Sequence, residues 1–322
     1  MIFRLLLSFK QIYKQENNKK IKRCKKEVLN NMKQKINGRT IEISNPHKVF
    51  YPNANITKGE ILNYYNRIAE YMLPHIRNRL VVMQRFPEGI GKEGFYHKQV
   101  PDYFPEWLQR KTVTLRKGEK QDIAVVNKKA DIIYMAEQGT ITYHIWLSQK
   151  DNIGKPDKLV FDLDPPKKGE FSEVKFAAYK LRDLFQDMGL IPYVMTTGSK
   201  GLHVVTPIKP EYDFDIIRQY VRDILTELVK KYPDRFTLEP RKDERQGRVF
   251  LDYLRHAFGQ TSVAPYSLRP IEGAPIATPL EWEKLPYIEN SQKYHMKNIF
   301  KRLSQKKDPW KEFKLHRKSL DI

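Results

Sequence analysis

Six short segments rich in Val, Ile, Phe and Tyr recur along the chain, and longer amphipathic stretches separate some of them. Runs of β-branched and aromatic residues predict strands. Several of these runs follow one another without an intervening helix, as hairpins do, which disfavours a doubly wound parallel sheet. We therefore predict an α+β fold, with a mixed β-sheet core, flanking helices and a smaller N-terminal module. The predicted strands are RLVVMQRF (79–86), TITYHIWLS (140–148), KLVFDLD (158–164), YVMTTG (193–198), LHVVTPI (202–208) and RVFLDYL (248–254).

Three stretches, at 57–76, 172–189 and 213–233, have apolar residues at the spacing of amphipathic helices. Thr57 is a natural N-cap for the first of them, and Glu60, three residues later, completes a capping box. These helices can cover the predicted sheet with their apolar faces.

Composition excludes two classes of protein. The 322 residues are 40% hydrophobic, enough for a sizeable core, but no apolar run approaches the roughly 20 residues that a membrane-spanning helix needs. The single cysteine, Cys24, excludes a disulfide framework and a cysteine-based zinc site. We therefore expect a cytoplasmic protein without a membrane partner.

The formal net charge of +21 lies mostly near the two ends. Residues 1–40 hold 12 Lys and Arg against 2 Asp and Glu, and residues 289–322 hold 10 against 4. Such segments can bind a polyanion, most often nucleic acid, although solvated tails that only aid solubility are the alternative. We expect a basic N-terminal extension (1–37), a central domain (38–288) and a basic C-terminal helix or tail (289–322). Met32 is an alternative start for the chain.

The segment VFDLDPP places two carboxylates at the end of a strand. Because side chains alternate along a strand, Asp162 and Asp164 share one face, and Pro165 and Pro166 end the strand beside them. Two neighbouring carboxylates repel each other unless a cation binds between them. The alternative is an ordinary polar turn.

A third carboxylate, Asp252, lies in RVFLDYLR, which we predict to be an apolar strand where an unpaired acid would be costly. Three carboxylates suit a pair of Mg²⁺ or Mn²⁺ ions about 4 Å apart, the arrangement used for phosphoryl and nucleotidyl transfer. In the alternative interpretation, Asp252 is a core acid paired with Arg255.

Between these carboxylates lies TTGSKGLHV, a glycine-containing turn between two predicted strands. The backbone N–H groups of such a turn can bind an anion, and Thr197, Ser199 and Lys200 add hydroxyl and ammonium donors for phosphate. The spacing differs from that of a P-loop, and a plain hairpin is the alternative. His203 follows in the next strand.

Four cations surround the Asp252 segment, namely Lys242, Arg248, Arg255 and Arg269. Such a concentration suits a triphosphate that must bind near metal-binding carboxylates. Ordinary ion pairing with Asp243 and Glu244 is the alternative.

In combination, VFDLDPP, TTGSKGLHV and FLDYLRHAFGQTSVAPYSLRP closely resemble the polymerase domain of bacterial DNA ligase D, in the archaeo-eukaryotic primase superfamily. NPHKVFYP, TKGEILNYY and RFPEGIGKEGFYHK resemble its amino-terminal part, so that the resemblance covers about 38–288. It implies a primase-like core and a polymerase without the ligase domain, since the sequence has no KxDG motif of an ATP-dependent ligase.

The resemblance implies roles for individual residues. Asp162, Asp164 and Asp252 correspond to catalytic residues that bind two divalent metal ions, Mn²⁺ or Mg²⁺. Thr197, Lys200 and His203 correspond to residues that contact the phosphates of the incoming nucleotide, and His144 and Arg255 correspond to residues beside that nucleotide. With the cations of the Asp252 segment, the expected nucleotide-binding set is His144, Thr197, Ser199, Lys200, His203, Arg248 and Arg255.

On the DNA side, Lys48 and Lys58 correspond to lysines that bind the 5′-phosphate across a gap or break. Phe95 corresponds to an aromatic residue that stacks on bases, a role that suits an aromatic ring. His97 stands where many family members have Gln, which puts any specific contact there in doubt.

The resemblance implies a template-dependent nucleotidyltransferase that extends and fills DNA ends with ribonucleotides or deoxyribonucleotides during non-homologous end joining. Its expected partners are DNA ends and gaps with a 5′-phosphate, NTP or dNTP, the end-binding protein Ku and a separate ATP-dependent DNA ligase. Its expected location is the nucleoid in the cytoplasm. Three alternatives stay open: a primase that starts strands de novo, a non-catalytic adaptor that binds DNA ends, and a metal-dependent nuclease.

Overall fold

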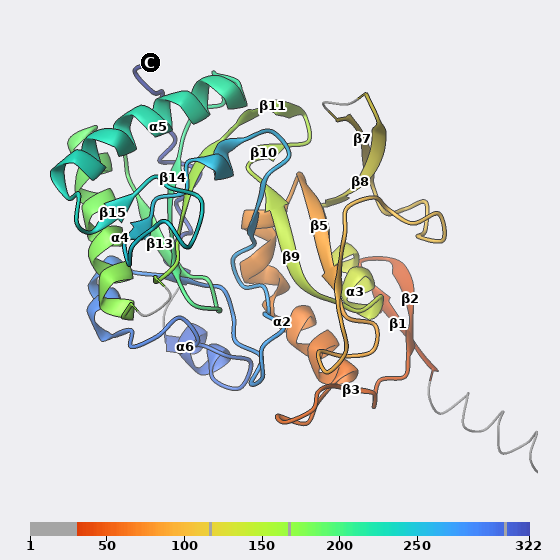
Figure 1. Cartoon of the computed structure of the whole chain (residues 1–322). Helices are drawn as coiled ribbons and strands as arrows, with labels where there is room; N and C mark the ends of the chain where they lie inside the picture. Colours follow the sequence, from red (N-terminus) through yellow and green to blue (C-terminus); the bar gives the residue numbers. More distant parts are fainter. Residues whose placement is uncertain (1–30, 116–117, 167–168, 306–307) are drawn as a thin grey trace, which may run out of the picture.

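The computed structural model describes residues 31–115, 118–166, 169–305 and 308–322. Two antiparallel sheets lie beside each other, one in the part of the chain coloured orange to yellow and one in the part coloured green (Figure 1). Each sheet has its own helices. The α+β class is therefore confirmed, and residues 1–30 of the expected N-terminal extension lie outside the described residues.

The larger sheet has six strands, and its described pairings are all antiparallel. Helices α2 (Lys58–Ile76) and α3 (Lys129–Glu137) share one hydrophobic cluster with it. The strand order is β17 (Thr261–Val263), β9 (Thr140–Trp146), β5 (Arg79–Arg85), β8 (Lys120–Val126) and β7 (Arg110–Thr114), and β6 (Phe95–His97) pairs with the free part of β5.

Helix α2 begins where the sequence predicts. The Thr57 hydroxyl accepts a hydrogen bond from the backbone N–H of Glu60, and the Glu60 carboxylate accepts one from the backbone N–H of Thr57. This reciprocal capping satisfies two N–H groups that a helix start leaves without partners. The capping box is therefore confirmed.

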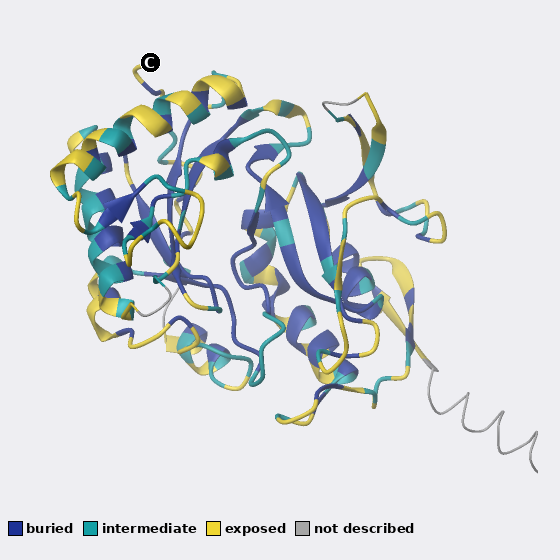
Figure 2. Ribbon diagram, viewed as in Figure 1, coloured by how far each residue is buried: buried dark blue, intermediate teal, exposed yellow. Residues whose placement is uncertain are grey.

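The smaller sheet has four antiparallel strands in the order β12 (Lys158–Leu163), β14 (Leu202–Pro207), β13 (Tyr193–Thr196) and β18 (Thr278–Leu280). Helices α4 (Phe171–Asp187) and α5 (Phe214–Lys231) bury their apolar faces against one side of it. Their outer faces are exposed, whereas the strands beneath are buried (Figure 2).

Shorter elements complete the described structure. Paired strands are β1 (Asn31–Ile36) with β2 (Arg39–Ser44), β3 (Val49–Tyr51) with β4 (Ile56–Thr57), β10 (Ser148–Gln149) with β11 (Asn152–Pro156), and the parallel pair β15 (Phe236–Thr237) with β16 (Val249–Phe250). The remaining helices are the 3₁₀ turns η1 (Leu254–His256) and η2 (Trp282–Tyr287) and helix α6 (Ile299–Gln305). Among the described residues, no helix is long and apolar enough to cross a membrane.

The structure differs from the sequence-based expectations at both ends. Strand β1 begins at Asn31 and pairs along its length with β2, so the folded region starts before residue 38. At the C-terminal end, Trp310 and Phe313 are buried against the four-stranded sheet, which ties the expected tail to the core.

The predicted strand 248–254 is wrong over most of its length. Only Val249–Phe250 is a strand, and it pairs with β15 outside the four-stranded sheet. Asp252 follows it in an irregular segment, and Leu254–His256 forms a 3₁₀ turn. Val249 and Leu251 are buried, as expected, whereas Leu254 is exposed. Arg255 contacts Asp162 of β12, which is distant in the sequence.

Candidate active site

Asp162 lies near the end of β12, directly opposite His203 of β14 in the sheet register. Nε2 of His203 is 3.3 Å from Oδ1 of Asp162. The two residues beside Asp162 along the strand, Phe161 and Leu163, pack under α4 and α5. Because side chains alternate along a strand, Asp162 points to the opposite face, toward the six-stranded sheet. The junction of the two sheets therefore holds this carboxylate.

Arg255, in the 3₁₀ turn η1, connects two of the three predicted carboxylates. Its Nη2 donates to Oδ2 of Asp162 at 2.6 Å and lies 3.4 Å from Oδ2 of Asp252. The backbone N–H of Arg255 also donates to Oδ1 of Asp252 at 3.2 Å, and its Nη1 donates to the carbonyl of Thr261. The structure thus brings Asp162 and Asp252 together around one guanidinium.

The three carboxylates differ in their electrostatic surroundings. Burial alone would raise the pKa of Asp162, but His203 and Arg255 outweigh burial and lower this pKa to about 2. Burial and the charge of Asp162 raise the pKa of Asp164. Burial also raises the pKa of Asp252, against the attraction of Arg255. Asp164 and Asp252 therefore lack enough nearby positive charge to stabilise their ionised forms, and a bound cation would supply that charge.

The glycine turn between β13 and β14 is organised by Thr197. Its hydroxyl accepts hydrogen bonds from the backbone N–H groups of Ser199 and Gly201, and it also contacts the hydroxyl of Ser291. Gly198 has φ +68, a conformation that favours glycine. Thr197 therefore fixes the loop as well as bordering the cavity, while the side chain of Lys200 is exposed at its tip.

The six-stranded sheet supplies the opposite wall. His144 of β9 is half-buried, and its buried Nε2 atom has no hydrogen-bond partner among the described residues. Burial and the charge of Arg269 lower the pKa of His144 to about 3, so its imidazole is neutral at pH 7. The ring of Tyr96, from β6, lies 5.4 Å from that of His144. A neutral imidazole beside charged groups can offer a hydrogen bond without adding charge.

These side chains surround one cavity of about 210 Å³, far more than the roughly 15 Å³ that one water molecule requires. Both sheets and the segment 255–269 contribute to it. Its lining consists of Tyr96, His144, Asp162, Asp164, Thr197, Ser199, His203, Arg255, Ser262, Val263 and Arg269.

Seven of the ten predicted catalytic and nucleotide-binding residues line this cavity, whereas Asp252, Lys200 and Arg248 do not. Nε of Arg248 donates to the carbonyl of Arg245, and Nη1 donates to the carbonyl of Pro233, beyond the end of α5. The strand prediction for 248–254 is the cause, because β16 pairs with β15 and takes Arg248 with it. Asp252 joins the site through Arg255, as described above.

The sequence did not indicate Tyr96 or Ser262, although both line the cavity, and Arg269 was expected only as one of four cations around the Asp252 segment. Tyr96 follows Phe95 in β6, and neighbouring residues of a strand face opposite sides. Phe95 is exposed beside Arg85, whose guanidinium lies 5.6 Å from the Phe95 ring centroid. Strand alternation in GFYHK could therefore have indicated that Tyr96 and Phe95 serve different surfaces.

A second cavity, of about 220 Å³, lies where β2, β3 and α2 approach α3, and both predicted phosphate-binding lysines border it. Nζ of Lys58 is buried and contacts Oε1 of Glu137 at 2.6 Å. Nζ of Lys48 contacts Oε2 of Glu88 at 2.6 Å near the surface. Arg85 also lines this cavity and donates to Nδ1 of His97 at 2.8 Å, which connects it to the strand that carries Phe95.

Comparisons with known proteins agree with this geometry. The family model for the LigD primase-polymerase domain matches residues 57–310. Among solved structures, the "Polymerase Domain from Mycobacterium tuberculosis Ligase D in complex with DNA" is similar, with a TM-score of 0.79 and 27% sequence identity. That match covers 86% of this chain and 99% of the other.

Two curated relatives are similar in sequence. The multifunctional non-homologous end joining protein LigD of Mycolicibacterium smegmatis is 32% identical over 247 residues, which cover 76% of this chain and 32% of the relative. The bifunctional non-homologous end joining protein LigD of Bacillus subtilis is 27% identical over 274 residues, which cover 85% of this chain and 44% of the relative. The chain thus spans a third to a half of these relatives, and it belongs to the LigD primase-polymerase domain family.

Proposed function

We propose that this chain is a template-dependent nucleotidyltransferase that extends DNA ends and fills short gaps during non-homologous end joining. The single observation that carries the proposal is the junction of the two sheets, where Asp162 and Asp252 meet at Arg255 beside Asp164 and His203. Membership of the LigD primase-polymerase family supports it, since that family is one of nucleotidyltransferases.

Asp162, Asp164 and Asp252 would hold divalent metal ions, Mg²⁺ or Mn²⁺. Carboxylate oxygens are the ligands that these hard cations prefer, and the raised pKa values of Asp164 and Asp252 show carboxylates that a cation would stabilise. When bound, such ions activate a 3′-hydroxyl and neutralise a triphosphate and its leaving pyrophosphate. Among the described residues, no group of three Asp, Glu, His or Cys side chains is arranged to hold a metal ion. At the candidate site, the guanidinium of Arg255 lies between two of the carboxylates.

The chain's own residues bind and orient the nucleotide. Lys200 and the hydroxyl of Ser199, on the turn fixed by Thr197, are placed to hold phosphate oxygens. Arg255 and Arg269 add guanidinium groups on the other side of the cavity. Neutral His144 supplies a hydrogen bond that does not compete with a metal ion for the carboxylates.

The DNA would bind along the side of the larger sheet. Lys48 and Lys58 border one cavity, which suits the 5′-phosphate on the far side of a gap. Exposed Phe95 offers a ring for base stacking. A repaired end also needs an end-binding Ku protein and an ATP-dependent ligase, because nucleotide addition leaves a nick. Such a substrate places the reaction at the nucleoid.

Primer extension on a one-nucleotide gap tests the proposal, with Mn²⁺ or Mg²⁺ and each NTP or dNTP supplied in turn. Two substrates are compared, one with a downstream 5′-phosphate and one with a 5′-hydroxyl. We expect addition of the templated nucleotide, with a preference for the 5′-phosphate substrate that Lys48→Met abolishes.

Three other outcomes contradict the proposal and identify the alternatives. Synthesis on unprimed single strands, without addition at the gap, would indicate a primase. Degradation of DNA with metal but without nucleotide would indicate a nuclease. DNA binding without any incorporation would indicate an adaptor.

A further inference from the structure

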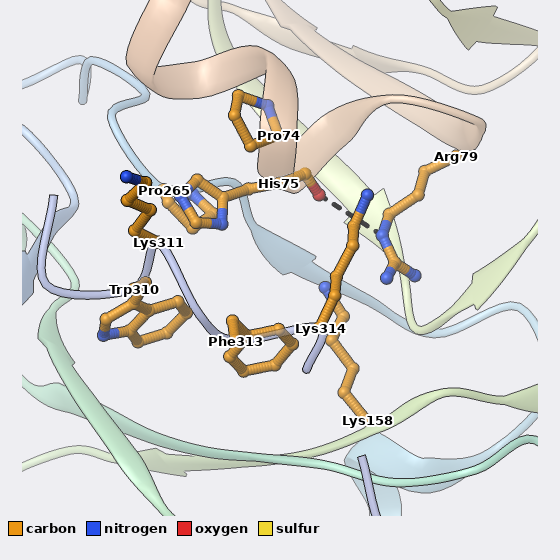
Figure 3. Close-up of a pocket in the computed structure, with 9 residues that line it drawn as sticks. All are labelled: Pro74, His75, Arg79, Lys158, Pro265, Trp310, Lys311, Phe313 and Lys314. Carbon is orange, nitrogen blue, oxygen red and sulfur yellow. Dashed lines mark hydrogen bonds between the residues drawn. The ribbon is translucent and has the colours of Figure 1, made fainter. Parts of the chain in front are cut away.

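A second charged pocket lies at the opposite end of β12 from the carboxylates. Lys158 begins this strand, four residues before Asp162, and strand alternation puts both on the same face at a separation of about 13 Å. The pocket has a volume of about 50 Å³. Three elements form it: the end of α2 with His75, the start of β5 with Arg79, and the C-terminal segment 310–314 (Figure 3).

The side chain of Lys158 is buried, with an exposed fraction of 6%, and among the described residues its ammonium group forms no hydrogen bond and no close ion pair with a carboxylate. Burial and the charge of Arg79 lower the pKa of Lys158 well below its usual value, although Asp157 acts in the opposite direction. Burial of an ammonium group costs free energy unless a hydrogen-bond acceptor or an anion compensates its charge.

The acidic side chains near the pocket are already paired. Asp157 contacts Arg79 at 2.7 Å and also binds Arg317. Asp308 contacts Nε2 of His75 at 2.8 Å and accepts a hydrogen bond from the hydroxyl of Tyr266. Both carboxylates are thus engaged by other cations, although Asp157 still attracts Lys158. The lining of the pocket holds no acidic side chain, so the pocket carries an excess of positive charge.

The walls and the rim of the pocket add to this arrangement. The rings of Trp310 and Phe313 stack on each other, with centroids 5.3 Å apart and an interplanar angle of 12°, and both are buried. Lys311 and Lys314 are exposed beside them. Figure 3 shows the side chains of Lys158 and Lys314 extending into the same space from opposite ribbons.

We propose that this pocket binds a phosphate-type oxyanion, which the ammonium group of Lys158 contacts directly. The volume suits a single tetrahedral anion and a few water molecules and is too small for a nucleoside. The donors approach from separate elements, which suits an anion with several oxygen atoms. Because the C-terminal segment forms one wall, the anion would link that segment to β12. The inference does not depend on the proposed polymerase activity.

Isothermal titration of the full chain with inorganic phosphate tests the proposal, with chloride used to keep the ionic strength constant. The variants are Lys158→Met and, as a matched control, Lys209→Met, since the side chain of Lys209 is exposed. Hydrogen bonds to charged groups are strong enough that we expect Lys158→Met to weaken phosphate binding about tenfold or more. The control should bind as the wild type does. Equal binding by Lys158→Met, or no binding by the wild type at millimolar phosphate, would overturn the proposal.

Thermal denaturation separates binding from a structural role. Without phosphate, Lys158→Met should melt at the same temperature as the wild type or higher, because the change replaces an unpaired buried charge with an apolar side chain of similar length. Phosphate should raise the melting temperature of the wild type but not of Lys158→Met. A lower melting temperature for Lys158→Met without phosphate would make Lys158 a structural counter-ion of Asp157 and contradict the proposal.

The phosphate could be free or belong to the end of a nucleic-acid strand. Competition with a short 5′-phosphorylated oligonucleotide, and with its 5′-hydroxyl counterpart, separates these sources. Displacement of inorganic phosphate by the phosphorylated strand alone assigns the pocket to strand ends, and no displacement assigns it to the free anion. The matched control Lys209→Met should not change either result, because the side chain of Lys209 is exposed.

Discussion

Arg255 compensates part of the negative charge of the three carboxylates. Its guanidinium joins Asp162 to Asp252, and Asp164 is left beside Asp162 with a raised pKa. A metal ion that binds these acids competes with Arg255 for the same oxygen atoms. The fold therefore keeps a charge conflict at this site, as residues placed for chemistry at the expense of stability often do.

Asp252→Asn should change the pH dependence of stability. Burial raises the folded-state pKa of Asp252, so the ionised carboxylate destabilises the fold at neutral pH, and this cost disappears as the pH falls below the unfolded value of about 4. We expect Asp252→Asn to be more stable than the wild type at pH 7, with a gain that shrinks on acidification, and to lose nucleotide addition. Urea denaturation across the pH range measures this. A stability difference that is independent of pH would contradict the assignment.

The two lysines that border the second cavity, Lys48 and Lys58, should differ in their effect on stability. Lys58→Met leaves Glu137 buried without its cation, and breaking such a pair costs about 3–5 kcal/mol. Lys48→Met removes a pair in which Glu88 is 69% exposed, and such pairs contribute at most about 1 kcal/mol. Chemical denaturation of both variants checks this ranking. Equal costs would mean that Glu137 has another partner or is protonated.

At the scale of elements, the turn between β13 and β14 has to approach the end of β12 closely. A Cβ atom on Gly201 would lie 2.0 Å from the carbonyl oxygen of Leu163 and 2.8 Å from Oδ1 of Asp164. Only glycine fits there without moving the turn. The phosphate-binding turn and the carboxylate strand are thus held together by backbone contact.

We expect Gly201→Ala to displace this turn and to cost more than the about 1–3 kcal/mol of an ordinary overpacked core position, because the clash is with backbone. Nucleotide affinity should fall as well. Gly154→Ala is the control, since nothing lies within 4 Å of its Cβ position. Thermal denaturation and nucleotide titration compare the two. If Gly201→Ala were as stable as the wild type, the close approach of the turn to the backbone of Leu163 would not constrain it.

The elements that sequence predicted best are those with local determinants. Thr57 and Glu60 cap α2 within a few residues of each other, and the strand that carries Asp162 is bounded by its own prolines. The segment 248–254 was mispredicted because long-range contacts decide it. Arg255 forms an ion pair with Asp162, which is 93 residues away in the sequence, and also contacts Asp252.

At the scale of the whole molecule, the site exists only where the two sheets meet. β12 and β14 supply Asp162 and His203, whereas β9 supplies His144. Composition could not reveal that the C-terminal segment packs against the four-stranded sheet. Its basic residues suggested a tail, but Trp310 and Phe313 pack against Tyr193 of β13, a contact that only the tertiary structure shows.

Trp310→Ala should therefore destabilise the whole chain. Removal of a buried tryptophan side chain costs about 3–5 kcal/mol, and Trp310 is 3% exposed. Leu315, five residues later, is 80% exposed, and Leu315→Ala should stay within about 0.5 kcal/mol of the wild type. Urea denaturation measures both. A mild effect of Trp310→Ala would mean that the C-terminal segment is only loosely attached.

The central claim is that the carboxylates at the junction of the sheets transfer nucleotides. The most direct test measures nucleotide addition to a one-nucleotide gap and DNA binding by fluorescence anisotropy in the same samples of wild type and Asp162→Asn. We predict that Asp162→Asn binds DNA as the wild type does and adds nucleotides no faster than a sample without enzyme. Addition at the wild-type rate by folded, DNA-bound Asp162→Asn would contradict the claim.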